Sequence, residues 1–442
     1  MTNPIVVKEY SNIKLEDCDL VKLHRYLECK NLGSALKVTP DGIKTKSWVG
    51  VIKYKKIHLQ ILPKLIYTEE YDNQSEEEKE SIKANILQNL IYMLSFVKKL
   101  EIKTSDAAKL STTKNPFIEV LIREFAKSLF DCLKRITPKK YIREEENLNY
   151  VKGKIKFAEN LRYNCINKAR FYCEYDEFSD NNILNQLFLF VSTCLYNIST
   201  DNYNKKLLKL IINYYSDITL VRFDKFKANK IKLSRNQELF KKPLKLAKMF
   251  VENTSVDLSK NKIENITLIW DMNKLFEEFV FKILKQKEND LNLKFTAQKC
   301  KRLFKDNKCR NTYVDIFAEP NKISNVKPAS PDKASKIIID TKYKKLASIN
   351  DFSNADVYQV STYCFIHNAE SAILIYPRWN TEEPEISGAC LNSDIKNINI
   401  KFKTINLKYE NLFEHQTEIN KEICDIFKTE KEIKIWLFFN HH

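Results

Sequence analysis

Apolar and polar residues alternate with a period of two over the first part of the chain, which predicts β-strands there. In Ile57–Ile61 every second residue is apolar, the pattern of a half-buried strand. The dipeptide Asp41-Gly42 follows the apolar stretch Ala35–Thr39 and is a turn signal typical of a hairpin. We therefore expect residues 1–75 to form a β-rich amino-terminal domain.

A helical repeat replaces this alternation further along the chain. Apolar residues recur three and four positions apart, as at Ile118, Leu121 and Phe125, so we expect residues 76–260 to form a mainly helical middle domain. Its longest uncharged stretch, Ile183–Thr200, contains Asn, Gln, Ser and Thr side chains. That composition is typical of a buried helix and not of a membrane span.

The connection between these two parts is acidic. Residues Thr68–Glu80 hold seven acidic residues and one lysine, which indicates an exposed segment. Within it, Ser75 and Glu78 have the spacing of a capping box, which predicts that a helix begins there.

Helices and strands alternate in the last part of the chain, residues 261–442. The whole chain is therefore expected to be an α+β multidomain protein whose carboxy-terminal domain is an α/β core. A proline-containing stretch, Glu319–Ser335, is expected to be a long hairpin loop. The predicted elements are a helix at Asn273–Gln286, strands at Leu293–Gln298, Tyr313–Ala318 and Lys336–Lys342, a helix at Asp356–His367 and a strand at Ser371–Tyr376.

The predicted strand Lys336–Lys342 carries an acid and a lysine two residues apart. Because alternate residues of a strand share a face, Asp340 and Lys342 are expected to project together while Thr341 points away. Pairing with the preceding strand would bring Asp315 beside Asp340. Two neighbouring carboxylates repel each other unless a cation lies between them, and hard oxygen ligands suit Mg²⁺. The alternative interpretation is a surface ion pair between Asp340 and Lys342.

The predicted helices on either side add polar residues to this region. Glu277 lies on the apolar face of its helix, whereas Glu278 lies among lysines on the polar face, so Glu277 is expected to point toward the sheet. Gln359 and Tyr363 are four residues apart on the following helix and can reach the same site or the same core.

The formal net charge of +17 favours a polyanionic partner such as nucleic acid, although a lysine-rich composition with solvated side chains would give the same value. Much of this charge lies in residues 205–250, which hold 13 Lys or Arg and 3 acidic residues. This segment is expected either to contact the DNA backbone or to be a solvated helix face over core aromatics. The interleaved aromatic residues are Tyr214, Tyr215, Phe223 and Phe226.

Glycine and cysteine usage excludes several classes of site. The chain has five glycines, and they form neither a P-loop nor a dinucleotide-binding motif, so a nucleotide would have to be bound by a partner. The 11 cysteines include no CxxC pair, so neither a disulfide framework nor a zinc site is predicted, and a reducing cytoplasm is the expected compartment. His24, His58, His367 and His415 are scattered singly, and no histidine base or thiol nucleophile is proposed.

The order of helix, strands and polar residues resembles the PD-(D/E)XK nuclease core, the restriction-endonuclease-like fold. The resemblance implies that Asp315, Asp340 and Glu277 hold Mg²⁺. It also implies that Lys342 positions or activates the attacking water and stabilises charge on the phosphate, with Gln359 at the same site.

Further segments are similar to the McrC family, the endonuclease subunit of McrBC-type, 5-methylcytosine-dependent restriction systems. The family usually has proline before the first catalytic aspartate, and this chain has Val314 at that position. Valine keeps the strand apolar and leaves the Asp315 carboxylate in place, so the difference concerns only the local backbone. The similar segments are Val49–Ile52, Leu59–Lys64, Asn89–Leu94, Val151–Ile155 and Cys173–Phe178.

The McrC resemblance implies a division of labour between two proteins. An McrC-like chain docks on a hexameric AAA+ GTPase of the McrB type, stimulates its GTP hydrolysis and cuts double-stranded DNA, while the partner binds GTP. Residues 1–75 correspond to the family's motor-contacting region. Arg25, Arg123 and Arg143 are the candidates for an activating arginine, and a surface ion pair is the alternative for each.

Two other functions stay open at this point. The chain could be a non-catalytic adaptor that activates the partner GTPase, in which case GTP turnover would occur without strand breaks. It could also be a basic DNA-binding module with a degenerate nuclease fold, whose binding would depend steeply on salt and not on metal.

Overall fold

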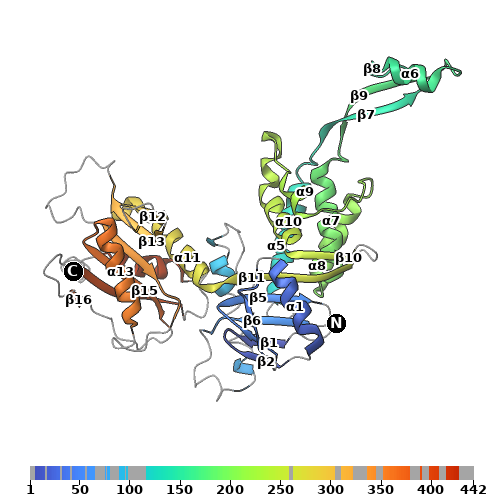
Figure 1. Cartoon of the computed structure of the whole chain (residues 1–442). Coiled ribbons are helices and arrows are strands. Elements are labelled where there is room, and N and C mark those ends of the chain that lie inside the picture. The colour runs from blue at the N-terminus through green and yellow to red at the C-terminus, as the bar shows by residue number, and fades with distance from the viewer. Residues whose placement is uncertain are drawn as a thin grey trace, which may run out of the picture. The chain divides into compact units, whose positions relative to one another are not determined.

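The computed structural model divides the chain into two compact units, each built from separated stretches (Figure 1). The first unit takes in residues 1–4, 51–58 and 112–268, and the second takes in residues 5–50, 59–111 and 269–442. The structure describes residues 5–14, 17–29, 32–39, 42–54, 57–64, 75, 77–79, 89–94, 96–97, 116–257, 262–303, 310–321, 336–344, 352–378, 389–390, 398–407 and 415–427.

The amino-terminal residues form short strands, as the alternating pattern predicts. The hairpin predicted at Asp41-Gly42 is confirmed, because the strands on either side pair antiparallel. A Cβ at Gly42 would lie 1.9 Å from the carbonyl oxygen of Ile13, so only glycine fits there. The elements are β1 (Ile5–Lys8), β2 (Asn12–Lys14), α1 (Asp17–Cys29), β3 (Leu36–Thr39), β4 (Gly42–Thr45), β5 (Trp48–Tyr54) and β6 (Ile57–Leu62), with a sheet order of β2-β4-β3 and parallel pairing of β1 with β6.

Strand β6 corrects one prediction. The alternation in Ile57–Ile61 predicts a half-buried strand, but β6 is buried along its whole length, including His58 and Gln60. Successive side chains of a strand point to opposite faces of the sheet, and all residues of β6 are buried, so both of its faces are covered.

The first unit is mainly helical, as predicted. The apolar face of α5 (Pro116–Leu133) is buried at Ile118, Leu121 and Phe125, and the uncharged stretch forms the buried helix α7 (Ile183–Ile198). None of the helices in the described ranges is both long and apolar enough to span a membrane. The remaining elements are α8 (Asn202–Tyr214), α9 (Lys225–Asn229), the 3₁₀ helix η2 (Arg235–Phe240), α10 (Lys241–Asn253) and the antiparallel strands β10 (Thr254–Asp257) and β11 (Lys262–Asp271).

A three-stranded antiparallel sheet in this unit was not predicted. It projects from the helices of its own unit (Figure 1), and we refer to residues 140–179 as the arm. Gly153 has φ +71°, and a Cβ there would lie 2.4 Å from the Glu174 carbonyl oxygen, so glycine is required where β8 meets β9. The arm consists of β7 (Lys140–Leu148), β8 (Lys154–Ile155), α6 (Phe157–Asn164) and β9 (Phe171–Ser179), in the sheet order β7-β9-β8.

Every helix and strand predicted for residues 261–442 is present in the carboxy-terminal part of the second unit. Its six-stranded sheet has the order β12-β13-β14-β15-β17-β16; the β12, β13 and β14 pairs are antiparallel, and β14, β15 and β17 are parallel. The elements are α11 (Met272–Gln286), α12 (Glu288–Leu291), β12 (Leu293–Arg302), β13 (Asn311–Pro320), β14 (Ile337–Thr341), α13 (Asn354–His367), β15 (Ser371–Arg378), β16 (Ala389–Cys390), β17 (Asn399–Asn406) and α14 (Gln416–Asp425).

The two predicted connections are only partly within the described residues. The capping box is confirmed, because the Ser75 backbone N–H donates to Glu78 Oε2 at 2.9 Å and the Glu78 N–H donates to Ser75 Oγ at 3.3 Å. The rest of the acidic stretch and most of the loop Glu319–Ser335 lie outside the described residues.

Candidate active site

The end of β14 holds a carboxylate and an ammonium group side by side, as the strand pattern predicts. Lys342 Nζ lies 2.8 Å from Asp340 Oδ2, and the Asp340 side chain is fully buried while that of Lys342 is about one-fifth exposed. The alternative of a surface ion pair is therefore wrong, because one partner has no contact with solvent. Removing such a charge from water is costly, so a buried carboxylate of this kind needs its cationic neighbour.

Strand β13 brings Asp315 to the same place. The ladder between β13 and β14 pairs Ile316 with Ile339, and continuing that register by one residue sets Asp315 opposite Asp340. Asp315 Oδ2 accepts hydrogen bonds from the backbone N–H of Thr341 at 3.0 Å and from its hydroxyl at 3.2 Å. The expectation that Thr341 points away from the acids is therefore wrong. The ladder has ended there, and a side-chain carboxylate takes the place of a backbone acceptor.

Glu277 faces the sheet, as predicted from the face of α11 on which it lies. It is partly buried, whereas Glu278 is exposed. Glu277 Oε1 accepts a hydrogen bond from Gln298 Nε2 of β12. The pKa of Glu277 is raised to about 7, mainly by burial. The negative charge of Asp315 adds to this increase, and the charge of Asp340 adds a smaller amount. Both aspartates therefore lie close enough to Glu277 to affect its ionisation.

The pKa values of Asp315 and Asp340 are both raised. Burial raises the pKa of Asp340, the negative charge of Asp315 adds to this effect, and Lys342 opposes it. Burial also raises the pKa of Asp315. Burial alone would lower the pKa of Lys342, but the surrounding carboxylates, Asp340 first, outweigh it and raise that pKa. Lys342 is accordingly held as an ammonium group.

Helix α13 supplies the polar residues predicted from their spacing. Lys342 Nζ donates a hydrogen bond to Gln359 Oε1 at 2.9 Å, and Gln359 Nε2 donates to the Tyr363 hydroxyl at 2.9 Å. The ammonium group of Lys342 thus lies between a carboxylate on its own strand and an amide oxygen on the helix. Gln359 and Tyr363 reach the same site, and this arrangement orients the lysine.

Two further residues of the site were not predicted. Gln298 has φ +50°, a left-handed backbone conformation, and lies opposite Asp315 in the ladder between β12 and β13, where Ala297 pairs with Ile316 and Lys299 with Val314. Its side chain donates a hydrogen bond to Glu277. Asp356 on α13 accepts a hydrogen bond from the Tyr376 hydroxyl at 3.3 Å, and its charge contributes to the raised pKa of Asp340. Neither residue stands in a motif that sequence spacing reveals.

The carboxylates fit a hard divalent cation by their chemistry. Asp340 Oδ1 is buried and has no hydrogen-bond partner among the residues that the structure describes. The negative charge of Asp315 raises the pKa of both Glu277 and Asp340, and a bound cation would relieve that repulsion. Within the described part of the chain, no three acidic, histidine or cysteine residues are already gathered closely enough to hold one metal ion.

The basic segment 205–250 divides into core and surface residues. Tyr215 and Phe223 are buried in the core, as one of the two interpretations expects. Phe226, in contrast, is 79% exposed on the short helix α9, and Lys225, Lys230 and Lys232 around it are exposed as well. The core interpretation therefore holds for Tyr215 and Phe223, and DNA contact by the exposed residues stays a prediction.

The candidate activating arginines lie in three different environments. Arg25 is exposed on α1, and Arg143 on the arm lies 3.6 Å from Glu174 in an exposed ion pair. Arg123 is buried on α5, so the surface ion pair considered for it is wrong. Its Nη2 donates to Asp201 Oδ1 at 3.0 Å and its Nε donates to Asn204 Oδ1 at 3.0 Å.

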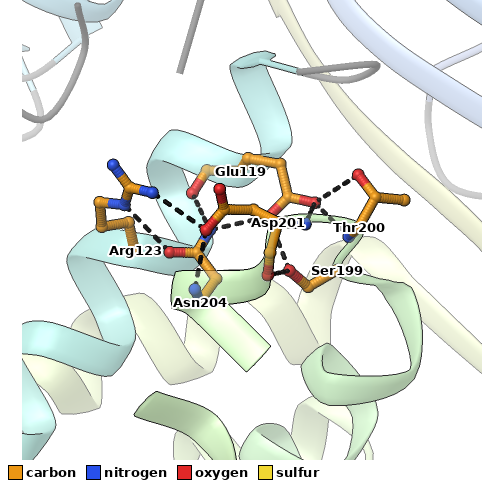
Figure 2. Close-up of polar contacts among 6 residues, drawn as sticks. All are labelled: Glu119, Arg123, Ser199, Thr200, Asp201 and Asn204. Carbon is orange, nitrogen blue, oxygen red and sulfur yellow. Dashed lines mark hydrogen bonds and ion pairs between the residues drawn. The ribbon is translucent and has the colours of Figure 1, made fainter. Parts of the chain in front are cut away.

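Arg123 belongs to a buried polar network between α5 and the start of α8 (Figure 2). Glu119 of α5 accepts hydrogen bonds from the Ser199 hydroxyl at 2.7 Å and from Asn204 Nδ2 at 2.7 Å. Asp201 caps α8 by accepting from the Asn204 backbone N–H at 2.8 Å. We therefore assign this network to the packing of α8 on α5 and not to contact with a partner.

Comparison with known protein families identifies the chain. The family model described as "McrBC 5-methylcytosine restriction system component" matches residues 43–377. The chain belongs to this family, and the family recognised from the sequence segments is confirmed. No curated protein matches the chain.

A solved structure shares the fold. It is a refined half-complex from a tetradecameric assembly of Thermococcus gammatolerans McrB AAA+ hexamers with bound McrC. It matches with a TM-score of 0.72 and 19% sequence identity, over 96% of this chain and 100% of that chain. A cryo-EM structure of the Thermococcus gammatolerans McrBC complex matches with a TM-score of 0.48 and 23% identity, over 64% and 88%.

Proposed function

We propose that the chain is the Mg²⁺-dependent DNA endonuclease subunit of a McrBC-type, modification-dependent restriction complex, with a PD-(D/E)XK core in residues 261–442. The observation that carries the proposal is the fully buried Asp340 in contact with Lys342, beside Asp315 and at the end of a central strand. An acid pair with an adjacent ammonium group is suited to phosphodiester hydrolysis, which needs a metal site and a positive charge near the phosphate.

Each residue of the site has a role in this proposal. Asp315, Asp340 and Glu277 hold the divalent cation, which supplies Lewis-acid polarisation of the scissile phosphate. Lys342, kept protonated by the carboxylates around it, faces the negative charge that develops on the phosphate and orients the attacking water. Gln359 fixes the lysine through its amide oxygen, and Tyr363 fixes the amide.

We also propose that the chain works with a hexameric AAA+ GTPase of the McrB type, which binds GTP and whose hydrolysis it stimulates. The absence of phosphate-binding glycine motifs from the sequence supports this division of labour. Residues 1–75 stay the motor-contacting region predicted from the family. The arm is a second candidate surface, because Phe157, Leu161 and Ile166 are 74%, 71% and 94% exposed there.

Contact with DNA outside the nuclease site is proposed for the exposed part of the basic segment. Phe226 offers an aromatic face, and Lys225, Lys230 and Lys232 offer positive charges around it. Asp224, the acid beside them, caps α9 by accepting the Lys227 N–H at 2.7 Å. A basic surface with an aromatic face is suited to a nucleic-acid backbone and its bases.

The experiment is cleavage of methylated DNA by the chain together with its AAA+ partner, GTP and Mg²⁺. Asp340→Asn and Lys342→Ala are expected to abolish strand breaks while GTP turnover continues. Lys336→Ala, at an exposed lysine directly before β14, is the matched control and should cut normally. Cutting by Lys342→Ala would remove the assigned site.

The same assay separates the alternatives. GTP turnover without strand breaks from the wild-type chain would indicate the regulatory adaptor. Metal-independent and steeply salt-dependent DNA binding, with neither activity, would indicate a DNA-binding module with a degenerate nuclease fold.

A further inference from the structure

The turn after β1 sends one side chain inward and the next outward. Tyr10 has φ +62°, a left-handed conformation that is uncommon for a residue with a side chain. The Thr45 hydroxyl holds the turn, since it donates to the Lys8 carbonyl at 3.0 Å and accepts from the Ser11 N–H at 2.9 Å. Glu9 is buried as a result, and Tyr10 is about half exposed.

Glu9 joins this turn to the segment that follows β6. Its Oε2 accepts the backbone N–H of Lys64 at 2.8 Å, and its own N–H donates to the Leu62 carbonyl at 3.0 Å. Lys64 Nζ then lies 5.0 Å from the centroid of the Tyr10 ring and 5.2 Å from that of Tyr343. Both separations are within the range of cation–π attraction.

Tyr343 is the direct neighbour of Lys342 in the candidate active site. It is buried, and its ring centroid lies 5.9 Å from that of Phe276, which directly precedes Glu277 on α11. Tyr343 and Phe276, which stand next to Lys342 and Glu277 in the sequence, therefore pack against each other. Lys64 contacts Tyr343, the residue that directly follows Lys342.

A second attachment runs from the same group of strands to the start of α11. The Met272 N–H donates to the Ser47 carbonyl at 2.7 Å, and the Ser47 hydroxyl donates to Asp271 Oδ1 at 3.3 Å. Asp271 caps α11 by accepting the Asn273 N–H at 3.0 Å. The amino-terminal part of this unit thus contacts two of the elements that carry site residues, α11 at its start and β14 through Tyr343 just after its end.

From these contacts we infer that Lys64 is a positioning residue of the nuclease site: fixed by Glu9, it holds the Tyr343 ring and thereby the end of β14 from which Lys342 projects. The inference rests on the proposed nuclease function. A cation–π contact at a partly exposed position stabilises a fold only modestly, so loss of Lys64 is expected to leave the chain folded. The effect should instead fall on the placement of Lys342.

The test uses the full-length chain in complex with its AAA+ partner and compares Lys64→Met, Lys64→Arg and Lys44→Met. Lys44 is exposed on β4, and its replacement is the matched control. We expect Lys64→Met to lower kcat for DNA cleavage about 10- to 100-fold with unchanged KM, because small misplacements of a catalytic group cost that much. Lys64→Arg keeps a cation between the two rings and should restore most of the rate. Lys44→Met should cut normally.

Hydrogen exchange provides a readout that is independent of cleavage. The Lys342 N–H donates to the Ile375 carbonyl at 2.9 Å, and the Thr341 N–H donates to Asp315. In Lys64→Met these two amides should exchange several-fold faster, while amides in the middle of β15 and all amides of Lys44→Met keep their wild-type rates.

The outcomes separate this inference from the proposed function. A wild-type kcat in Lys64→Met, or unchanged exchange at residues 341 and 342, overturns the positioning role even though the complex cuts DNA. If the wild-type complex does not cut, the proposed function fails, and the exchange data still decide whether Lys64 holds the end of β14. If Lys64→Met does not fold, Lys64→Gln, which keeps a polar end at this partly exposed position, is measured in the same way.

Discussion

Replacing Arg123 by methionine tests whether the buried network between α5 and α8 fixes the helical unit. The Arg123 guanidinium is the cation that contacts Asp201, and Glu119 contributes a second buried carboxylate close by (Figure 2). Arg123→Met retains the apolar stem and removes the charge. It leaves the Asp201 carboxylate without its cation and Asn204 Oδ1 without its donor.

The expected loss is about 3 kcal/mol, the lower end of the range for breaking a buried ion pair by removing one partner. The lower end applies because the side chains of Arg123 and Asp201 are 7% and 17% exposed, so water screens the pair slightly. The control is Lys134→Met in the turn directly after the same helix. Lys134 lies 3.6 Å from Asp131, and both are more than half exposed, so this change should cost less than about 1 kcal/mol.

A double-mutant cycle isolates the charge interaction from packing. Asp201→Asn keeps a good capping residue for α8 and removes its charge, so combining it with Arg123→Met should cost less than the sum of the two single changes. The measurement is hydrogen exchange of the α8 amides, which reports the local opening free energy. Global unfolding is less suitable because the chain has two compact units. Equal losses for Arg123→Met and Lys134→Met, or strict additivity in the cycle, would refute the reasoning.

Three further outcomes follow from described residues. Burial raises the pKa of Glu9 from an ordinary 4.5 to about 7, so its contribution to stability is fully present below about 4.5 and is lost as the pH rises through about 7. Glu9→Gln should match the wild type at pH 4 and be up to about 3 kcal/mol more stable at pH 8 in the local opening free energy given by hydrogen exchange of the Glu9 and Lys64 amides, and equal stability at both pH values would contradict this. Ile166→Ser on the arm should weaken co-purification with the AAA+ partner without changing thermal unfolding, and unchanged association would exclude that surface. Exchanging Lys230 and Lys232 for glutamate should reduce the slope of log affinity for DNA against log salt by about 0.9 per lost phosphate contact, measured in a cleavage-deficient Asp340→Asn background, and an unchanged slope would exclude DNA contact there.

The carboxy-terminal elements and the contact of Asp340 with Lys342 followed from the sequence because two patterns coincide there. Buried strands appear as short apolar runs between loops, and an acid that interrupts such a run has to face something other than the core. The antiparallel pairing of β13 with β14 then set Asp315 at the same level. No pattern in a single strand reports a left-handed residue such as Gln298 or the helix residue that its side chain contacts, which is why Gln298 was missed.

The arm could not be predicted because neither of its long strands alternates between apolar and polar residues. Strand β7 is mostly exposed, and it is held by nine residue pairs with β9 and not by a core. Pairing of two polar strands leaves little trace in hydropathy. The alternation in β6 gave a wrong prediction of a half-buried strand, because its polar residues His58 and Gln60 are buried as well as its apolar ones.

The interleaved division of the chain has a practical consequence for gene dissection. Residues 51–58 belong to the same unit as residues 112–268, although the chain between them belongs to the other unit. A fragment expressed from residue 112 onward would lack residues 1–4 and 51–58 of the first unit, and a fragment ending at residue 111 would lack residues 269–442 of the second unit. Separate expression therefore calls for a fused or circularly permuted coding sequence, since no single cut yields either part whole.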